Sequence, residues 1–196
     1  MPEEEQRHSD PAITEAGPAN PVDLLNDQQR YDLECILELQ KRWPGAVTER
    51  SPQTMARLLQ QGLIPMVRDK NGEVIACFYQ QPLNAETEVD QQELVYRWGG
   101  LVTNSSREAK KAIIELLVEE SGKFRQHHSG SAIAKTSNRC ISQTLSESGW
   151  TAVNYEECAT RFPQQLKTYL AHSHKPAEYY RDQMFYVLKL ENITDN

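Results

Sequence analysis

Apolar residues recur at helical spacing in two segments of the first third of the chain. The first segment, 26–43, starts at Asn26 with a glutamine three residues later, the pattern of a capping box. The second, 51–62, starts with Ser51 followed by a proline and ends at Gly62, a residue typical of helix stops. The pattern therefore predicts two consecutive amphipathic helices.

The next apolar runs have the composition of β-strands. Residues 63–81 contain two β-rich runs separated by Asn71-Gly72, a dipeptide typical of the type I′ turn. These runs predict a β-hairpin. A polar stretch then leads to another apolar run, which predicts a strand at 93–103.

Two consecutive glycines, Gly99 and Gly100, interrupt this last strand. Glycine inside a strand marks a bulge or a close approach of the backbone to another group. We expect a bulge that parts the strand from a neighbour. The alternative is that the glycines relieve crowding beneath Trp98 or a helix.

The second half of the chain alternates between helical and extended patterns. The predicted elements are an amphipathic helix with Ala109, Ala112, Ile113, Leu116, Leu117 and Phe124 on one face, a strand at 131–137, a helix at 138–149, a strand from Trp150, a helical piece at 162–172 and a strand at 184–190. This order predicts an α/β (α+β) protein with a single mixed, mostly antiparallel central sheet flanked by helices.

The length and the composition indicate one domain with a tail. Residues 1–21 carry four prolines, several acids and almost no apolar side chains, so we expect a disordered N-terminal tail. Residues 22–196 are then predicted to form a single domain, since the chain of 196 residues leaves little room for a second core.

The charge and the hydropathy exclude several classes of function. A net charge of −7 argues against a nucleic-acid surface, which needs clustered basic residues. No apolar run approaches the roughly 20 residues that cross a bilayer, and no signal-peptide pattern stands at the N-terminus. We therefore expect a cytoplasmic protein without a membrane segment.

The cysteines and histidines do not have the spacing of a metal site. Cys35, Cys77 and Cys140 lie in apolar patterns and are predicted to be buried thiols. The paired histidines lie near predicted helix ends without acidic or cysteine partners, and these are His127, His128, His172 and His174. We expect no metal.

Three segments of the sequence together resemble the GNAT superfamily of acyl-CoA-dependent N-acyltransferases, over residues 27–190. "IPMVRDKNGEVIACFY" is similar to the opening hairpin of that family. "WGGLVT" with the helix after it is similar to the central strand and the cofactor-binding helix. "NRCISQTLSESGW" is similar to the late helix, where Asn138 and Gly149-Trp150 match an asparagine and a Gly-Phe pair.

The resemblance implies acetyl-CoA or another acyl-CoA as co-substrate and no metal. In such a fold the central strand splays from its neighbour and exposes backbone groups to the pantetheine arm, while the following helix directs its N-terminus at the pyrophosphate. The implied cofactor-binding residues are Leu101, Val102, Thr103, Arg107, Glu108, Ala109, Lys110, Lys111 and Asn138. For Asn138, capping of the late helix is the alternative.

The phosphate loop departs from the family pattern, Arg/Gln-x-x-Gly-x-Gly/Ala. The corresponding segment "TNSSREAKKA" has no glycine, and Ser105 with Glu108 fits a capping box that would occupy the same N–H groups. The side chains of Arg107, Lys110 and Lys111 are the basic groups that could hold phosphates in place of the backbone, with a solvated helix surface as the alternative.

The catalytic residues also depart from the family. Many members carry a tyrosine on the late helix that protonates the leaving thiolate, and Leu145 stands at that position here. Tyr155 is a candidate substitute, with a half-buried edge position as the alternative. Glu93 is the candidate general base, with an exposed strand-end carboxylate as the alternative.

The main functional hypothesis is a divergent N-acyltransferase, an acetyltransferase in the first instance, that acylates a small-molecule or peptide amine by direct attack. The alternatives are a catalytically inactive GNAT-like binding protein and an acyltransferase whose donor is an acyl-carrier protein. Five aromatic residues of the C-terminal part are candidates for an acceptor pocket or a homodimer contact, and these are Tyr155, Phe162, Tyr169, Tyr179 and Tyr180.

Overall fold

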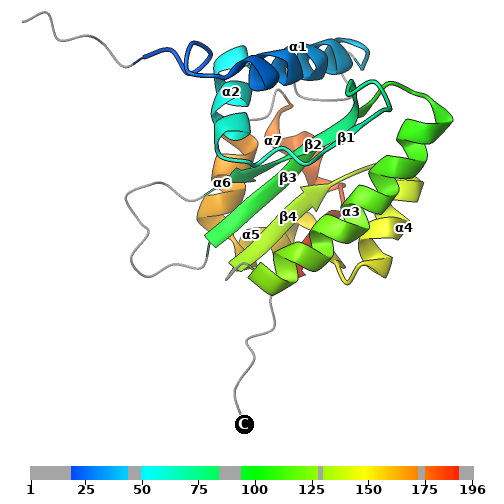
Figure 1. The fold of residues 1–196 in the computed structure, drawn as a ribbon. Helices are drawn as coiled ribbons and strands as arrows, with labels where there is room; N and C mark the ends of the chain where they lie inside the picture. Colours follow the sequence, from blue (N-terminus) through cyan, green and yellow to red (C-terminus); the bar gives the residue numbers. More distant parts are fainter. Residues whose placement is uncertain (1–18, 44–49, 84–93, 128–129, 172–174, 190–196) are drawn as a thin grey trace, which may run out of the picture.

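The computed structural model describes residues 19–43, 50–83, 94–127, 130–171 and 175–189. Within them, six strands form one sheet in the order β1-β2-β3-β4-β6-β5 (Figure 1). The strands are β1 (Met66–Arg68), β2 (Val74–Pro82), β3 (Leu94–Thr103), β4 (Gly130–Lys135), β5 (Thr151–Val153) and β6 (Phe185–Lys189). Only β3 and β4 pair in parallel, which confirms the predicted mixed, mostly antiparallel sheet.

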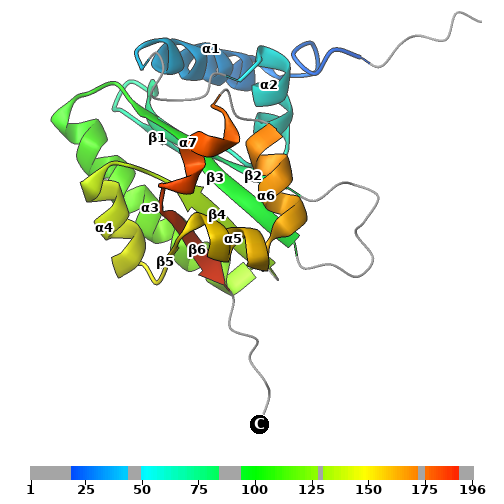
Figure 2. The same ribbon diagram turned by 180° about the vertical axis from the view of Figure 1, so that it is seen from behind.

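Seven helices within the described residues cover the two faces of this sheet (Figures 1 and 2). They are α1 (Asp27–Lys41), α2 (Pro52–Gln60), α3 (Arg107–His127), α4 (Arg139–Glu147), α5 (Tyr155–Arg161), α6 (Pro163–Ala171) and α7 (Ala177–Arg181). Helices α3 and α4 pack on one face, whereas α1, α2 and the segment α5–α7 pack on the other.

The alternation of side chains along β4 shows how the sheet separates these layers. Ala132 and Ala134 belong to the core beneath α3 and α4, whereas Ile133 belongs to the core beneath α5–α7. Both faces of β4 are therefore buried, which fits its composition of small and branched apolar residues.

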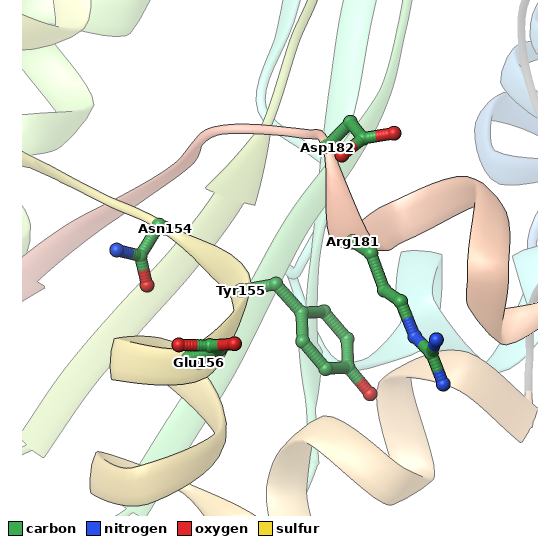
Figure 3. A pocket seen from close by; sticks show the side chains of 5 residues that line it. All are labelled: Asn154, Tyr155, Glu156, Arg181 and Asp182. Carbon is green, nitrogen blue, oxygen red and sulfur yellow. The ribbon is translucent and has the colours of Figure 1, made fainter.

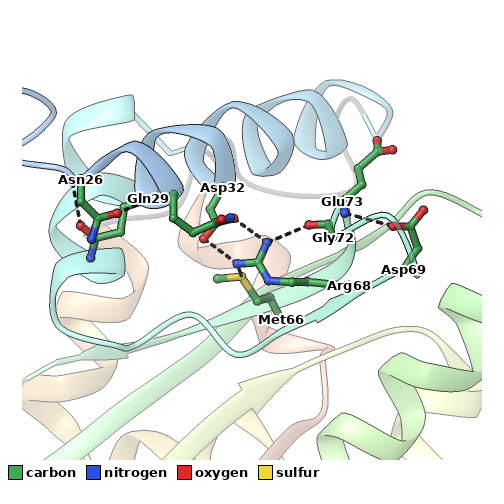
Figure 4. Close-up of polar contacts among 9 residues, drawn as sticks. Asn26, Gln29, Asp32, Met66, Arg68, Asp69, Gly72 and Glu73 are labelled. Carbon is green, nitrogen blue, oxygen red and sulfur yellow. Dashed lines mark hydrogen bonds and ion pairs between the residues drawn. The ribbon is translucent and has the colours of Figure 1, made fainter.

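Helix α1 begins as the sequence predicts and is tied to β1 by an ion pair (Figure 4). The capping box of Asn26 and Gln29 is formed in both directions, with N···O distances of 2.8 and 3.1 Å. Asp32 is 4% exposed, and its two carboxylate oxygens accept from the two terminal nitrogens of Arg68 at 2.6 and 2.7 Å. The hydrogen bond to Asp32 raises the pKa of Arg68, so this bidentate pair stays charged.

The hairpin between β1 and β2 forms, but its turn is not the predicted type I′ turn. Gly72 has a φ of 85°, whereas Asn71 does not adopt the left-handed conformation that a type I′ turn also requires. The Asp69 carboxylate instead accepts from the backbone N–H of Asn71 at 2.8 Å. It also accepts from the backbone N–H of Glu73 at 3.0 Å (Figure 4). This side chain organises a wider loop, which is why the dipeptide alone was misleading.

The cysteine predictions are partly wrong. All four cysteines are free thiols; Cys77 and Cys158 are buried, Cys35 is half-buried and Cys140 is exposed. Burial raises the pKa of Cys77 to about 12 and that of Cys158 to about 11. Cys140 was expected in the core because its neighbours are apolar, but it lies in the first turn of α4, beside the N-cap.

Candidate functional site

Strands β3 and β4 diverge halfway along their length. Their parallel pairing runs from Leu94 opposite Gly130 to Trp98 opposite Ala134. Beyond that point β3 continues to Thr103, while β4 ends one residue later at Lys135 and pairs there with β6. Among the strands that the structure describes, none pairs with the backbone at 99–103 on its β4 side, which is the splay expected from the sequence.

A β-bulge lies at the start of this unpaired stretch. Cys77 pairs with Val102 and Tyr79 pairs with Gly99, so two residues of β3 stand opposite one residue of β2. Gly100 has a φ of 63°, a conformation that glycine adopts readily. The predicted bulge is therefore confirmed.

The glycines of the bulge also make room for Tyr79. A Cβ on Gly100 would lie 2.3 Å from Cε1 of Tyr79, and one on Gly99 would lie 3.1 Å from its hydroxyl oxygen. Crowding was the alternative explanation for the glycines, and it applies as well. The crowding group is a tyrosine on the neighbouring strand β2 and not Trp98 or a helix.

A cavity of about 760 Å³ opens where the two strands part. We call it the cleft. It is lined by residues from β2, β3, α3, β4, the N-terminus of α4 and the segment from α6 to α7. Four of the predicted cofactor-binding residues line it, and these are Leu101, Thr103, Lys110 and Asn138. Asn138 also caps α4, since its side-chain oxygen accepts from the N–H groups of Cys140 and Ile141.

The N-terminus of α3 is capped one residue later than predicted. The Ser106 hydroxyl accepts from the Ala109 N–H at 3.0 Å, so Ser106 is the capping residue and the expected Ser105–Glu108 capping box is wrong. Ser105 instead has a φ of 69°, a conformation that the sequence pattern did not indicate. Its N–H donates to the Thr103 hydroxyl at 3.2 Å, and the Ser106 N–H donates to the Asn104 side chain at 3.0 Å.

The other predicted cofactor-binding residues lie away from the cleft lining. Val102 and Ala109 are buried in the two cores on opposite faces of the sheet. Arg107, Glu108 and Lys111 are exposed on the first turns of α3, where Lys111 pairs with Glu115. The predicted base, Glu93, lies outside the described residues.

Tyr155 lies in a different pocket, of about 540 Å³, together with Asn154, Glu156, Arg181 and Asp182. Figure 3 shows its phenol ring beside the side chain of Arg181. The ring packs against Phe185 with centroids 6.4 Å apart. None of these five pocket residues lines the cleft, so the structure does not bring Tyr155 together with Lys110 or Asn138.

The described lining of the cleft is cationic, although the chain is acidic overall. Arg97, Lys110, Lys135 and Lys175 contribute to it, and the lining includes no aspartate, glutamate or histidine from the part of the chain that the structure describes. Arg97, Lys135 and Lys175 were not predicted from the sequence, because they belong to segments far apart in the chain. Such a lining favours anionic ligands.

Two buried donors in the cleft lack acceptors among the described residues. The indole N–H of Trp98 is one, and the Nε–H of Arg97 is the other. Trp98 is fixed by T-shaped contacts with Trp150 and Phe124, at centroid distances of 5.0 and 5.8 Å. An unpaired buried donor is costly, and neither nitrogen has surface that is accessible from the cleft, so both are internal polar groups of its wall.

Aromatic residues of the C-terminal segment form one side of the cleft. Tyr169, Tyr179 and Tyr180 line it, whereas Phe162 is packed in the core beneath α5–α7. Lys135 donates to the Tyr179 hydroxyl at 3.3 Å and holds that ring at the cleft. The sequence named these aromatic residues but could not distinguish the lining residues from the core residues.

The described residues contain no group of three or more side chains that could hold a metal ion. None of the helices that the structure describes is both long enough and apolar enough to cross a bilayer.

No protein-family model and no curated protein sequence matches the chain. Solved structures do match it in fold. One chain of the NatC complex, bound to Gag peptide and CoA, is 14% identical with a TM-score of 0.57, over 85% of this chain and 96% of that chain. Rv2747 from Mycobacterium tuberculosis, solved in complex with CoA, is 12% identical with a TM-score of 0.54, over 82% of this chain and 95% of that chain.

A GNAT-family acetyltransferase from Staphylococcus aureus Mu50 matches in the same way. It is 13% identical with a TM-score of 0.52, over 85% of this chain and 96% of that chain. The three matches cover 82–85% of this chain. The fold of this chain is therefore that of the GNAT acetyltransferases.

Proposed function

We propose that the protein transfers an acyl group from acyl-CoA to an amine in the cleft between β3 and β4. The observation that carries the proposal is the parting of the two strands at a bulge, next to a cationic cavity. Such a gap offers unpaired strand backbone to an extended ligand that carries its own amide groups, as pantetheine does. The fold shared with CoA-bound acetyltransferases supports the same assignment.

The residues of the cleft fit an acyl-CoA. The backbone at 99–103 would pair with the pantetheine amides and polarise the thioester carbonyl. Lys110 would neutralise phosphate charge through its side chain. This replaces the backbone cradle, because the N–H groups of Ser105, Ser106 and Ala109 already donate to side chains of the loop.

The reaction that this cleft supports is direct attack. The neutral amine nitrogen bonds to the thioester carbonyl carbon and the carbon–sulfur bond breaks. The proton that the nitrogen loses passes to the departing thiolate, directly or through water, so the products are the amide and the CoA thiol. No carboxylate or imidazole of the described lining could take that proton, so the protein would rely on the neutral amine and on carbonyl polarisation. Glu93 stays a proposed base, and Tyr155 is not needed for this scheme.

A binding protein without catalysis is the second candidate. It is favoured by the loop before α3 and by the first turn of this helix, where the N–H groups of Ser105, Ser106 and Ala109 already donate to side chains. In that case the chain would still bind CoA in the cleft but would release no free thiol from acetyl-CoA in the presence of any amine.

Thermal unfolding with added ligands tests the proposal. Acetyl-CoA should raise the melting temperature saturably, and pantetheine should raise it less because it lacks the phosphates that Lys110 would contact. Absence of a shift with acetyl-CoA and with longer acyl-CoAs would contradict both the enzyme and the CoA-binding alternative.

A further inference from the structure

Arg97 is a charged residue in the interior of the sheet. It lies on β3, between Gln81 of β2 and Ile133 of β4, and only 5% of it is exposed. Its guanidinium lies on the face covered by α6, with its carbon 4.1 Å from the ring centroid of Tyr169. It also lines the cleft.

The contacts of Arg97 leave its charge uncompensated. It donates one hydrogen bond, from Nη1 to the backbone carbonyl of Tyr169 at 3.3 Å. Within the described residues it has no carboxylate partner, and its buried Nε has no acceptor. A guanidinium is usually buried only with a paired anion, because desolvation of an unpaired charge is costly.

Packing alone does not explain an arginine at this position. The stacking on Tyr169 is a cation–π contact, yet an apolar side chain of similar length would fill the same space without the desolvation cost. Its nearest aromatic neighbours, Tyr169 and Tyr79, supply no anion. Because Arg97 lines the cleft, an anionic ligand bound there would supply the compensating charge.

The position of Arg97 indicates that the negatively charged ligand group belongs to the acceptor and not to the acyl donor. Lys110 reaches the cleft from α3, on the face where the donor phosphates would lie. Arg97 points to the opposite face, between α6 and Tyr79. The two cationic groups therefore mark two ends of a cavity that passes through the sheet.

We infer that Arg97 binds a carboxylate of the acceptor, so that the acceptor is an amino acid or a related amino-carboxylate. The inference rests on the proposed function and specifies its substrate class. A guanidinium presents parallel N–H groups that match the two oxygens of a carboxylate. The acceptor would then lie on the face of the sheet that α6 covers, and its amine would reach the bulge from that face.

Paired acceptors test this inference. The twenty amino acids and their carboxamides, with aspartate and glutamate fully amidated, are compared as acceptors with acetyl-CoA as donor. At least one amino acid should be acetylated with a kcat/KM at least about 100-fold above that of its carboxamide, since a buried charge left unpaired discriminates strongly. Acetylation of the carboxamides at equal efficiency, or of none of the amino acids, would overturn the inference.

Substitution of Arg97 provides a second readout. Arg97→Met should abolish the preference for the carboxylate mainly through KM, leave the Kd of acetyl-CoA unchanged, and keep or raise the melting temperature. Arg97→Lys keeps the charge but not the paired N–H groups, and should lose most of the preference. Arg57→Met, on the exposed side of α2, is the matched control.

The outcomes separate three explanations. A lower melting temperature of Arg97→Met with an unchanged acid-to-amide ratio would show that Arg97 only holds α6, and would overturn the inference. Weaker acetyl-CoA binding by the same variant would assign Arg97 to the donor and overturn it as well. If wild-type protein does not bind acetyl-CoA at all, the proposed function fails and this inference fails with it.

Discussion

Replacement of Gly100 by alanine tests how the bulge and Tyr79 shape the cleft. The added methyl would lie 2.3 Å from Cε1 and 2.6 Å from Cδ1 of the Tyr79 ring. The ring is 1% exposed and its hydroxyl accepts from Arg50 at 3.1 Å, so it has little freedom to move. Overpacking of this kind costs about 1–3 kcal/mol.

The left-handed backbone at Gly100 adds a second cost. A residue with a Cβ at a φ of 63° loses about 1–2 kcal/mol. Alanine also lowers the conformational entropy of the unfolded chain, which stabilises the folded protein by about 0.4–1 kcal/mol. We therefore expect Gly100→Ala to lower the free energy of unfolding by about 2–4 kcal/mol.

Gly72→Ala is the matched control, because Gly72 has a φ of 85° and no atom within 4 Å of an added Cβ. Urea titration should show that Gly100→Ala loses about 1–3 kcal/mol more free energy of unfolding than Gly72→Ala. This difference measures the cost of the overlap with Tyr79. In a Tyr79→Val background that difference should disappear. Equal losses for Gly100→Ala and Gly72→Ala would refute the steric reasoning.

Three further results are expected. Iodoacetamide should label the exposed Cys140 but not Cys77, because burial raises the pKa of the Cys77 thiol to about 12. CoA should slow the labelling of Cys140, and equal labelling rates with and without CoA would contradict the position of Cys140 in the cleft. Ser105→Gly should raise the free energy of unfolding by about 1 kcal/mol in urea titration, because it relieves a left-handed serine, and a loss would contradict that conformation. Arg68→Met should lower the free energy of unfolding by about 2–4 kcal/mol, because the buried Asp32 carboxylate loses its bidentate partner. A loss below about 0.5 kcal/mol would show that the ion pair is solvated.

The periodic parts of the sequence were sufficient to predict the sheet and its main helices. The apolar alternation and the Gly99-Gly100 pair indicated a bulged central strand, and both the bulge and the splay of β3 are present. Two short helices were missed, α5 and α7. Their seven and five residues are too few to display a helical stripe of apolar positions.

The details that failed depend on single side chains or on tertiary contacts. The N-cap of α3 and the hairpin turn each differ from the prediction by a local hydrogen bond, which the Ser106 hydroxyl accepts in the first case and the Asp69 carboxylate in the second. Sequence patterns offer several such side-chain partners within one or two residues, and the choice among them is made by the packed structure.

The cleft was harder to predict because it brings together distant residues. Arg97 and Tyr169 are in contact although 72 positions separate them. A signal was nevertheless available, since an arginine stands in the middle of the apolar strand at 93–103. A charged residue inside a buried strand needs a polar partner, so Arg97 indicates a polar site beside this strand.

The most direct test of the central proposal, that the β3–β4 cleft binds acyl-CoA, is calorimetric titration of acetyl-CoA into three forms of the protein. These are wild type, Lys110→Glu and Lys111→Glu, which place the same charge change on adjacent residues of α3. Because only Lys110 lines the cleft, Lys110→Glu should weaken binding at least about tenfold and Lys111→Glu by less than about twofold. Equal weakening by both variants, or no saturable binding by wild type, would contradict the proposed site.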